Sequence, residues 1–239
     1  MNLVIDSGNT FIKLGIFEKG RQPEFHFRLD EKQLIEKTRQ FSPKRVIISS
    51  VKNDAAELAS YFKESSPLIF NSKTPLPVGN LYKTPETLGA DRIAAVIGAK
   101  TRLPEKDCLV IDAGTCITYD FIDRDNQYQG GGISPGLEMR FQALNHFTAR
   151  LPLLHAWNEA ELIGKTTEES IESGIINGLH AEVAGIIGRY RQIYPELQVF
   201  FCGGDAGFFE TKLKESIFVV PELVMLGLNR ILEHNASSF

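Results

Sequence analysis

The sequence predicts an α/β protein built as two halves of similar length, each with a mixed β-sheet. The main observation is a repeat: Leu-Val-Ile-Asp-Ser-Gly at residues 3–8 returns as Leu-Val-Ile-Asp-Ala-Gly at residues 109–114. In both halves a meander of strand patterns is followed by alternating helix and strand patterns, an order typical of α/β proteins. A repeated strand-and-turn unit indicates a duplicated domain, so we expect domains at residues 1–104 and 105–239.

Short apolar and β-branched runs predict the strands of the first half, and runs with a helical period predict its helices. Residues 71–87 carry prolines and a glycine among polar residues, so we expect an irregular connection there. The expected strands are 2–6, 11–17, 23–29, 45–49 and 68–70, and the expected helices are about 31–40, 53–64 and 90–101.

The second half opens in the same order as the first. Thr166 and Glu169 form a predicted capping box ahead of a long apolar stripe with a helical period. Pro221 is suited to start a last apolar helix. The expected strands are 108–112, 116–122 and 197–202, and the expected helices follow Pro135-Gly136, Thr166 and Pro221.

Composition limits the possible functions. The chain has 239 residues, 43% apolar and 23% charged, as in a globular protein of one large or two small domains. A net charge of −4 without a Lys/Arg stripe argues against nucleic acid as a partner. No apolar run approaches the ~20 residues that span a bilayer, and the strand-like N-terminus argues against a signal peptide. We therefore expect a cytoplasmic protein without membrane contact, with reduced cysteines at Cys108, Cys116 and Cys202.

The first repeat ends in a turn that is suited to phosphate. Gly8 lets the backbone approach an anion closely, and Asn9 and Thr10 add side-chain donors. Lys13 on the next strand can supply a cation. Asp6 would repel phosphate unless a divalent metal lies between them, the usual arrangement in phosphoryl transfer. The alternative is an ordinary hairpin in which the aspartate and asparagine only form the turn.

The second repeat, with Asp112, Gly114 and Thr115, has the same chemistry, and the occurrence of both turns together favours ligand binding over two unrelated hairpins. Residues 130–136 are a third glycine-rich segment, directly before a helical pattern. A loop that feeds a helix N-terminus is a common anion site. A flexible connection is the alternative.

Asp91 has two interpretations. At the start of the 90–101 helix it is a favoured N-cap. It can instead accept the proton of a substrate hydroxyl, with Arg92 holding a substrate carboxylate through two parallel hydrogen bonds. Thr167 is likewise either a helix cap or a ligand donor, and Tyr82 either contacts substrate or covers the surface near Pro85.

Other catalytic patterns are absent from the sequence. Its five histidines form no metal-binding pair, and neither a Gly-x-Ser-x-Gly elbow nor a P-loop occurs. Nucleophilic hydrolysis and zinc chemistry are therefore poor candidates.

An ordered set of motifs resembles type III pantothenate kinase. This family belongs to the superfamily of acetate and sugar kinases, heat-shock chaperones and actin. The resemblance implies actin-like ATPase architecture, with two ribonuclease-H-like domains that have mixed sheets and hold ATP between them. The motifs are Asp6-x-Gly8-Asn9-Thr10-x-x-Lys13, Gly89-Ala90-Asp91-Arg92, Asp112-x-Gly114-Thr115 and Gly131-Gly132-Ile133-x-Pro135-Gly136.

The resemblance also implies the reaction, which is transfer of phosphate from ATP to the pantothenate hydroxyl, the first step of coenzyme A biosynthesis. Asp91 would be the base, Asp112 would bind potassium or ammonium, and Asp6 would hold magnesium through water. The family forms homodimers in which the partner subunit borders the substrate site. The implied ATP contacts are Asp6, Ser7, Gly8, Asn9, Thr10, Phe11, Ile12, Lys13 and Thr115, and the implied pantothenate contacts are Tyr82, Gly89, Ala90, Asp91, Arg92 and Thr167.

Two residues depart from the family's pattern. Cys116 replaces the expected alanine, and Thr166 stands where asparagine often precedes the threonine that contacts substrate, so the choice of Thr167 over Thr166 depends on spacing. Gly203-Gly204-Asp205 resembles the superfamily's glycine turn near adenosine. Two other functions stay open: a kinase of another small hydroxylated metabolite, and a nucleotide-binding regulator related to the Bvg accessory factor.

Overall fold

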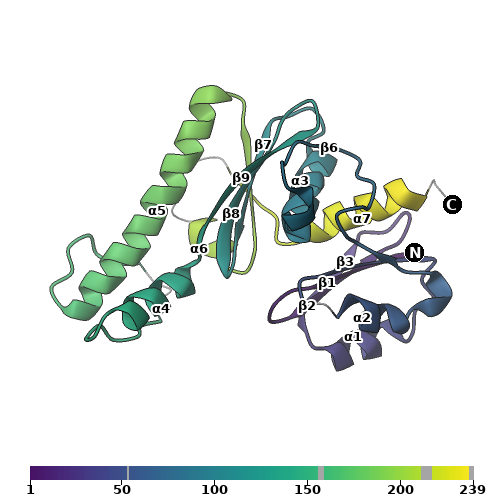
Figure 1. Ribbon diagram of the computed structural model, residues 1–239, viewed down its shortest axis with the longest axis horizontal. Coiled ribbons are helices and arrows are strands. Elements are labelled where there is room, and N and C mark those ends of the chain that lie inside the picture. The colour runs from purple at the N-terminus through teal and green to yellow at the C-terminus, as the bar shows by residue number, and fades with distance from the viewer. Residues whose placement is uncertain (53, 156–158, 211–216, 237–239) are drawn as a thin grey trace. The chain divides into compact units, whose positions relative to one another are not determined.

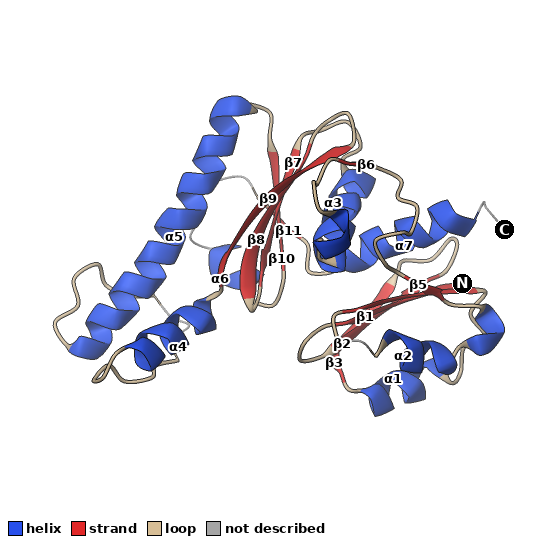
Figure 2. Cartoon of the chain, viewed as in Figure 1, coloured by secondary structure: helices blue, strands red, loops and turns tan. Residues whose placement is uncertain are grey.

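The computed structural model describes residues 1–52, 54–155, 159–210 and 217–236. It has the expected α/β fold with two mixed sheets (Figure 2). Contacts divide the chain into two compact units that are not sequential. The first unit comprises residues 1–105, 124–129 and 222–239, and the second comprises 106–123 and 130–221. The last helix, which lies within the predicted domain 105–239, therefore groups with the first unit.

The first unit is built on a five-stranded sheet in the order β3-β2-β1-β4-β5. Strand β1 pairs antiparallel with β2 and parallel with β4. Apolar side chains such as Leu3, Ile5 and Leu14 are fully buried in its core. The elements are β1 (Asn2–Ser7), β2 (Ile12–Phe17), β3 (Glu24–Leu29), α1 (Glu31–Thr38), β4 (Arg45–Ser50), α2 (Ala55–Ser60), the 3-10 turn η1 (Lys63–Ser65), β5 (Leu68–Ile69), β6 (Gly79–Asn80), the 3-10 turn η2 (Pro85–Thr87), α3 (Ala90–Arg102) and α7 (Leu223–Asn235).

Helices α3 and α7 pack backbone against backbone within the first unit (Figure 1). A Cβ atom added at Gly98 would lie 2.2 Å from the Leu223 carbonyl oxygen, and one added at Gly227 would lie 1.8 Å from the Ala94 carbonyl oxygen. Only glycine therefore permits this helix–helix distance.

The second unit carries most of a six-stranded sheet in the order β11-β10-β7-β8-β9-β6. Its end strand β6 pairs with Gln127 and Tyr128, which group with the first unit. The elements are β7 (Cys108–Ala113), β8 (Cys116–Ile122), β9 (Gln127–Pro135), α4 (Leu137–Phe147), α5 (Thr167–Ile193), β10 (Gln198–Cys202), α6 (Ala206–Glu210) and β11 (Phe218–Val219).

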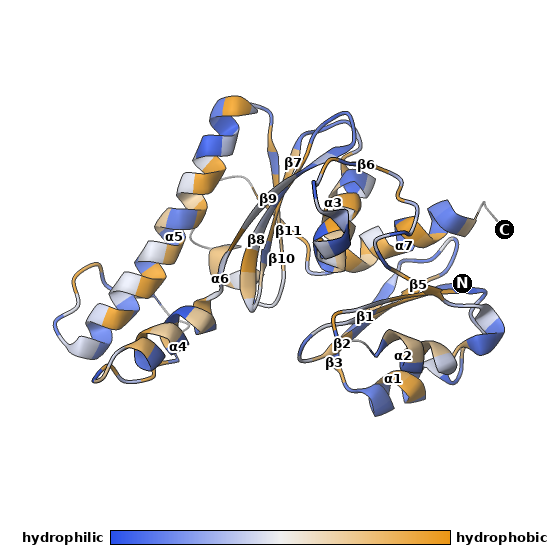
Figure 3. Ribbon diagram, in the orientation of Figure 1, coloured by the Kyte–Doolittle hydropathy of each residue, from blue (hydrophilic) through white to orange (hydrophobic). Residues whose placement is uncertain are grey.

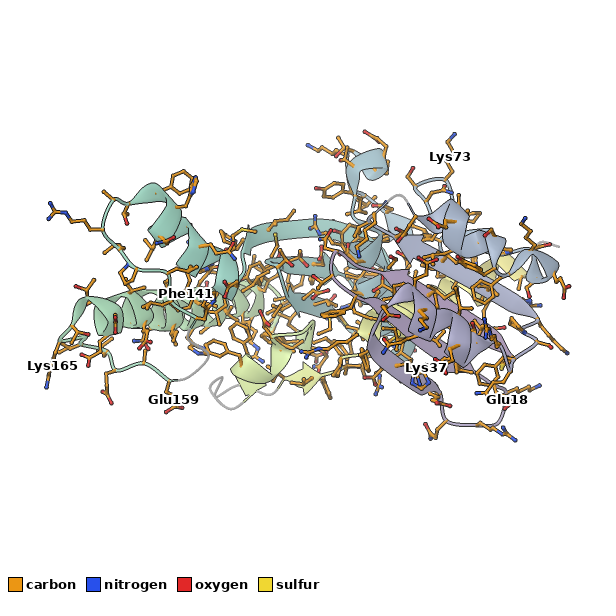
Figure 4. All side chains as sticks on the ribbon, turned by 90° about the horizontal axis from the view of Figure 1, so that it is seen from below. Glu18, Lys37, Lys73, Phe141, Glu159 and Lys165 are labelled. Atoms are coloured by element: carbon orange, nitrogen blue, oxygen red, sulfur yellow. The ribbon has the colours of Figure 1, made fainter. Side chains whose placement is uncertain are left out.

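The predicted apolar stripe of the long helix is confirmed in α5. Ile171, Leu179 and Val183 are buried against the sheet, while polar residues take up other positions along the helix (Figure 3). Phe141 of α4 joins the same core with 1% of its surface exposed (Figure 4). Among the described residues, no helix combines the length and the apolar character needed to cross a bilayer.

Three local expectations need correction. The glycine run 130–132 lies inside β9 instead of a loop, and position 131 needs glycine because a Cβ there would come within 1.6 Å of the Tyr119 carbonyl oxygen. The connection 71–87 is not wholly irregular, since it contains β6 and η2. The helix expected at about 53–64 is replaced by α2 and the turn η1, and residue 53 lies outside the described residues.

Candidate active site

The turn between β1 and β2 brings a carboxylate and an ammonium group together. Asp6 and Lys13 face each other in the strand register, and Lys13 Nζ lies 3.2 Å from Asp6 Oδ2. Asp6 is 5% exposed, and burial raises the pKa of its carboxyl above the ordinary 3.8, although Lys13 opposes the rise. The Gly8 N–H donates to the Phe11 carbonyl at 3.1 Å and closes the turn.

The other predicted ATP contacts differ in their exposure and in the hydrogen-bond donors available to a ligand. Asn9, Thr10 and Phe11 are exposed at the turn, whereas the Ile12 side chain packs into the core. Ser7 is fully buried, and its hydroxyl donates to Asp54 Oδ2 at 2.8 Å. Because that proton is already used, the Ser7 hydroxyl is not a donor to a ligand in this arrangement.

Asp54 joins two neighbouring parallel strands at their carboxyl ends. Its carboxylate accepts hydrogen bonds from Ser7 at the end of β1 and from Ser50 at the end of β4. The Val51 N–H also donates to the Ser7 carbonyl at 3.1 Å. These bonds tie the β1–β2 turn to the β4–α2 loop. The sequence did not point to Asp54, because the residue lies in no motif and its hydrogen bonds to Ser7 and Ser50 depend on the tertiary fold.

Asp91 is in the first turn of α3, and Gly89 takes the N-cap position that the alternative interpretation gave to Asp91. Asp91 Oδ1 accepts the Arg92 N–H at 2.9 Å. A Cβ at Gly89 would lie 2.6 Å from this same oxygen, so the missing side chain leaves room for the carboxylate. Asp91 also contributes electrostatically to the raised pKa of Asp6. Asp6 therefore lies within electrostatic range of both Lys13 and Asp91, and all three residues belong to the first unit.

Arg92 and Tyr82 also meet in the first unit. The Arg92 Cζ atom lies 5.7 Å from the centre of the Tyr82 ring, a cation–π distance, and Arg92 is only 7% exposed. Tyr82 is half-buried and contacts the ring of Tyr128. The sequence did not point to Tyr128, since a lone tyrosine in a strand pattern carries no functional signal.

The second repeat forms a tightly packed turn in the second unit. A Cβ at Gly203, where φ is +91°, would lie 2.4 Å from Asp112 Oδ1, and one at Gly136 would lie 2.5 Å from the Thr115 carbonyl oxygen. The Gly136 N–H donates to that carbonyl at 3.2 Å, and the Asp205 N–H donates to the Ala113 carbonyl at 2.9 Å. Two distant segments of the sequence, at Gly136 and at residues 203–205, thus converge on the turn that contains Asp112 and Thr115.

A second network supports this turn. Arg140 of α4 donates to the Pro135 carbonyl at 2.9 Å, to Ser134 Oγ at 2.8 Å and to Glu182 Oε2 at 2.6 Å. The Tyr119 hydroxyl donates to Glu182 Oε1 at 2.8 Å. Burial alone would raise the pKa of Glu182, but the hydrogen bonds from these groups lower it. The network holds Ser134 and Pro135 just before Gly136.

Thr166 and Thr167 lie at the start of α5. Thr166 is the N-cap, and its Oγ1 accepts the Glu169 N–H at 3.1 Å. The predicted capping box is only half formed, because the Glu169 carboxylate accepts from the Lys165 N–H instead of from Thr166. Both threonines line an open groove of about 1000 Å³ between α4 and α5, together with Arg140, Lys165 and Leu144. Lys165 projects from this end of α5 (Figure 4).

Comparisons with known proteins identify the family. A family model described as type III pantothenate kinase matches residues 2–189. A type III pantothenate kinase of Bacteroides fragilis is 46% identical over 241 residues, covering 98% of each chain. One of Phocaeicola vulgatus is 47% identical over 244 residues, covering 98% of this chain and 99% of the relative. One of Cytophaga hutchinsonii is 44% identical and is covered over its full length.

Solved structures agree on the fold. A Baf family protein from Campylobacter jejuni aligns with a TM-score of 0.63 at 22% identity, over 98% of this chain and 99% of that one. A protein from Listeria monocytogenes described as an N-acetylmannosamine kinase aligns with a TM-score of 0.55 at 11% identity, over 98% of this chain and 99% of that one. At these identities the likeness concerns the fold, which is that of the sugar kinases and actin-like ATPases. On the strength of the family match and the nearly full-length relatives, the chain belongs to the type III pantothenate kinase family.

Proposed function

We propose that the chain transfers the γ-phosphoryl group of ATP to the terminal hydroxyl of pantothenate, the entry step to coenzyme A. Family membership supports the reaction. The observation that supports these residues as the site is the gathering of Asp6, Lys13 and Asp91 in one unit, with Asp91 at a helix start where Gly89 leaves space for its carboxylate. A cytoplasmic location remains part of the proposal, since ATP is available there.

In this mechanism the Asp91 carboxylate accepts the hydroxyl proton while the hydroxyl oxygen forms a bond to the γ-phosphorus. The bond from that phosphorus to the bridging oxygen breaks, and ADP leaves. Lys13, the Asn9 and Thr10 side chains and the backbone N–H groups that follow Gly8 in the turn stabilise the negative charge on the phosphates. Arg92 holds the carboxylate end of pantothenate, which fixes the hydroxyl relative to Asp91.

Two cations belong to the proposal. Among the described residues no cluster of three or more His, Cys, Asp or Glu side chains could hold a metal by itself. Asp6 would hold magnesium near the ATP phosphates through water. Magnesium neutralises phosphate charge when bound. Asp112 fits a potassium or ammonium ion, because its carboxylate lies in a cradle that a Cβ at Gly203 would fill.

We further propose a homodimer in which Thr167 reaches the partner's substrate. The second unit offers apolar surface for such contact, since five of its large apolar side chains are 64–82% exposed. Light scattering should give twice the chain mass of 26.7 kDa, and a monomer at micromolar concentration would refute the dimer. The exposed side chains are Ile133, Phe147, Leu162, Ile163 and Ile193.

The test of the function is an assay of purified protein with ATP, magnesium and pantothenate, with and without potassium. Asp91→Asn keeps the size of the side chain and removes the base, so kcat should fall by about 10²–10⁴-fold with unchanged unfolding behaviour. A folded variant with near-normal kcat would remove Asp91 from the base role. Transfer to sugars or acetate in preference to pantothenate would favour another kinase, and ATP binding without any product would favour a regulator.

A further inference from the structure

A short β-hairpin tip carries a residue that reaches the substrate segment of the first unit. Residues 124–129, which comprise most of the turn after β8 and the first three residues of β9, group with the first unit. Asn126 has φ of +60°, a left-handed conformation that asparagine tolerates better than most residues and that permits the tight turn. Tyr128 follows two residues later and is fully buried.

Backbone hydrogen bonds attach the segment before Tyr82 to this tip. The Gly79 N–H donates to the Asn126 carbonyl at 2.9 Å, and the Leu81 N–H donates to the Tyr128 carbonyl at 3.0 Å. The Tyr82 N–H donates to Asn80 Oδ1 at 3.0 Å. These hydrogen bonds to the hairpin tip fix the backbone that carries the Tyr82 side chain.

The side chains continue the same connection. The rings of Tyr128 and Tyr82 lie 6.1 Å apart between centres and 30° from parallel. The guanidinium carbon of Arg92 lies 5.7 Å from the Tyr82 ring centre. Burial decreases from Tyr128 to Tyr82, so the inner ring is held by the core and the outer ring reaches toward solvent. An aromatic ring attracts a guanidinium only while it keeps its orientation under it.

We propose that Tyr128 is a positioning residue that orients Arg92 through Tyr82 and thereby sets the affinity for a substrate carboxylate. Tyr128 does not touch substrate. Its ring limits the positions open to Tyr82, and the Tyr82 face in turn limits those open to the Arg92 guanidinium, whose planar fork must match the carboxylate. This inference rests on the proposed function, because Arg92 is there given the carboxylate end of pantothenate.

The experiment is a double-mutant cycle on kcat/KM for pantothenate at saturating ATP. Tyr128→Leu should lower kcat/KM about tenfold and leave KM for ATP within about twofold, as expected for a weakened cation–π contact at the carboxylate end. In the Arg92→Ala background the same substitution should change kcat/KM by less than about twofold, because the effect passes through Arg92. Tyr128→Phe, which keeps the ring, should retain most of the wild-type value.

Phe62→Leu is the matched control, since Phe62 is a buried aromatic residue of the sheet core in the same unit. It should lower stability without lowering kcat/KM for pantothenate. An equal tenfold loss in the Arg92→Ala background, or in Tyr128→Phe, would overturn the proposal. So would an active wild type whose Tyr128→Leu variant keeps its kcat/KM. A folded wild type that phosphorylates no pantothenate would instead refute the proposed function.

Discussion

Replacing Gly89 with alanine tests whether the position of the Asp91 carboxylate matters. The added Cβ would lie 2.6 Å from Asp91 Oδ1, whereas ordinary contact begins at 3.4 Å. The carboxylate must therefore retreat by about 0.8 Å or rotate away from its bond with the Arg92 N–H. Gly89 has φ of −56° and ψ of 130°, which alanine adopts without strain, so the change acts on the carboxylate and not on the backbone.

The expected effect on the reaction is large compared with the effect on stability. A displacement near 1 Å in a catalytic group can cost about 100-fold in rate, so we expect kcat to fall by roughly 10–100-fold. Loss of a glycine N-cap for alanine costs about 1 kcal/mol or less of unfolding free energy. Steady-state kinetics with ATP and pantothenate measure the first quantity, and urea unfolding measures the second.

Gly185→Ala provides the matched control, because a Cβ at this α5 position meets nothing within 4 Å. It should leave kcat unchanged and raise helix stability by about 0.5–1 kcal/mol. A folded Gly89→Ala variant with kcat within twofold of wild type would show that the space beside Asp91 has no catalytic importance. Such a result would contradict the placement of the base argued from that space.

Two other predictions concern stability. Gly227→Ala would place a Cβ 1.8 Å from the Ala94 carbonyl oxygen, so α3 and α7 must separate and urea unfolding should show a loss of about 3 kcal/mol or more; a loss below 1 kcal/mol would contradict the close packing. Burial and Glu138 raise the pKa of Asp205 from 3.8 to about 6, so the stability contribution of its protonated form is complete below pH 4 and lost as pH rises through 6. The unfolding free energy of the wild type should therefore fall by about 1 kcal/mol between pH 4 and pH 7, a value reduced for solvent screening at this half-buried site, and Asp205→Asn should abolish that fall. Urea unfolding across this pH range measures it, and identical pH profiles for wild type and variant would refute the raised pKa of Asp205.

The strands with apolar runs, such as β1 and β7, were predictable because those runs are local, whereas β6, β9 and β11 were not predicted. The run that contains Leu3 and Ile5 is buried in β1 as its composition indicates, and the stripe of Ile171 and Val183 is buried in α5. Gly131 was wrongly predicted to lie in a loop. Glycine is needed there because the Tyr119 carbonyl of the neighbouring strand leaves no room for a Cβ, and no local sequence pattern encodes that contact.

In the candidate site, too, contacts between residues close in sequence were predictable and contacts between distant segments were not. Asp6 and Lys13 are close in sequence and face each other across a hairpin, so their pairing could be predicted from spacing. Asp54 and Tyr128 contact the site from distant parts of the chain, through the sheet and through a hairpin tip. Their roles become visible only when the fold brings them there, and neither residue type is distinctive in a sequence.

The grouping of α7 with the first unit has a consequence for how the protein is made. Strands β1 and β4 contact a helix that starts only at Leu223, so the first unit cannot be completed before that helix has been synthesised. The turn between β1 and β2 is thus synthesised long before the helix that completes its unit. Nascent chains and truncated products that lack α7 should therefore remain inactive and be exposed to proteases, which makes the C-terminal helix a checkpoint for full-length synthesis.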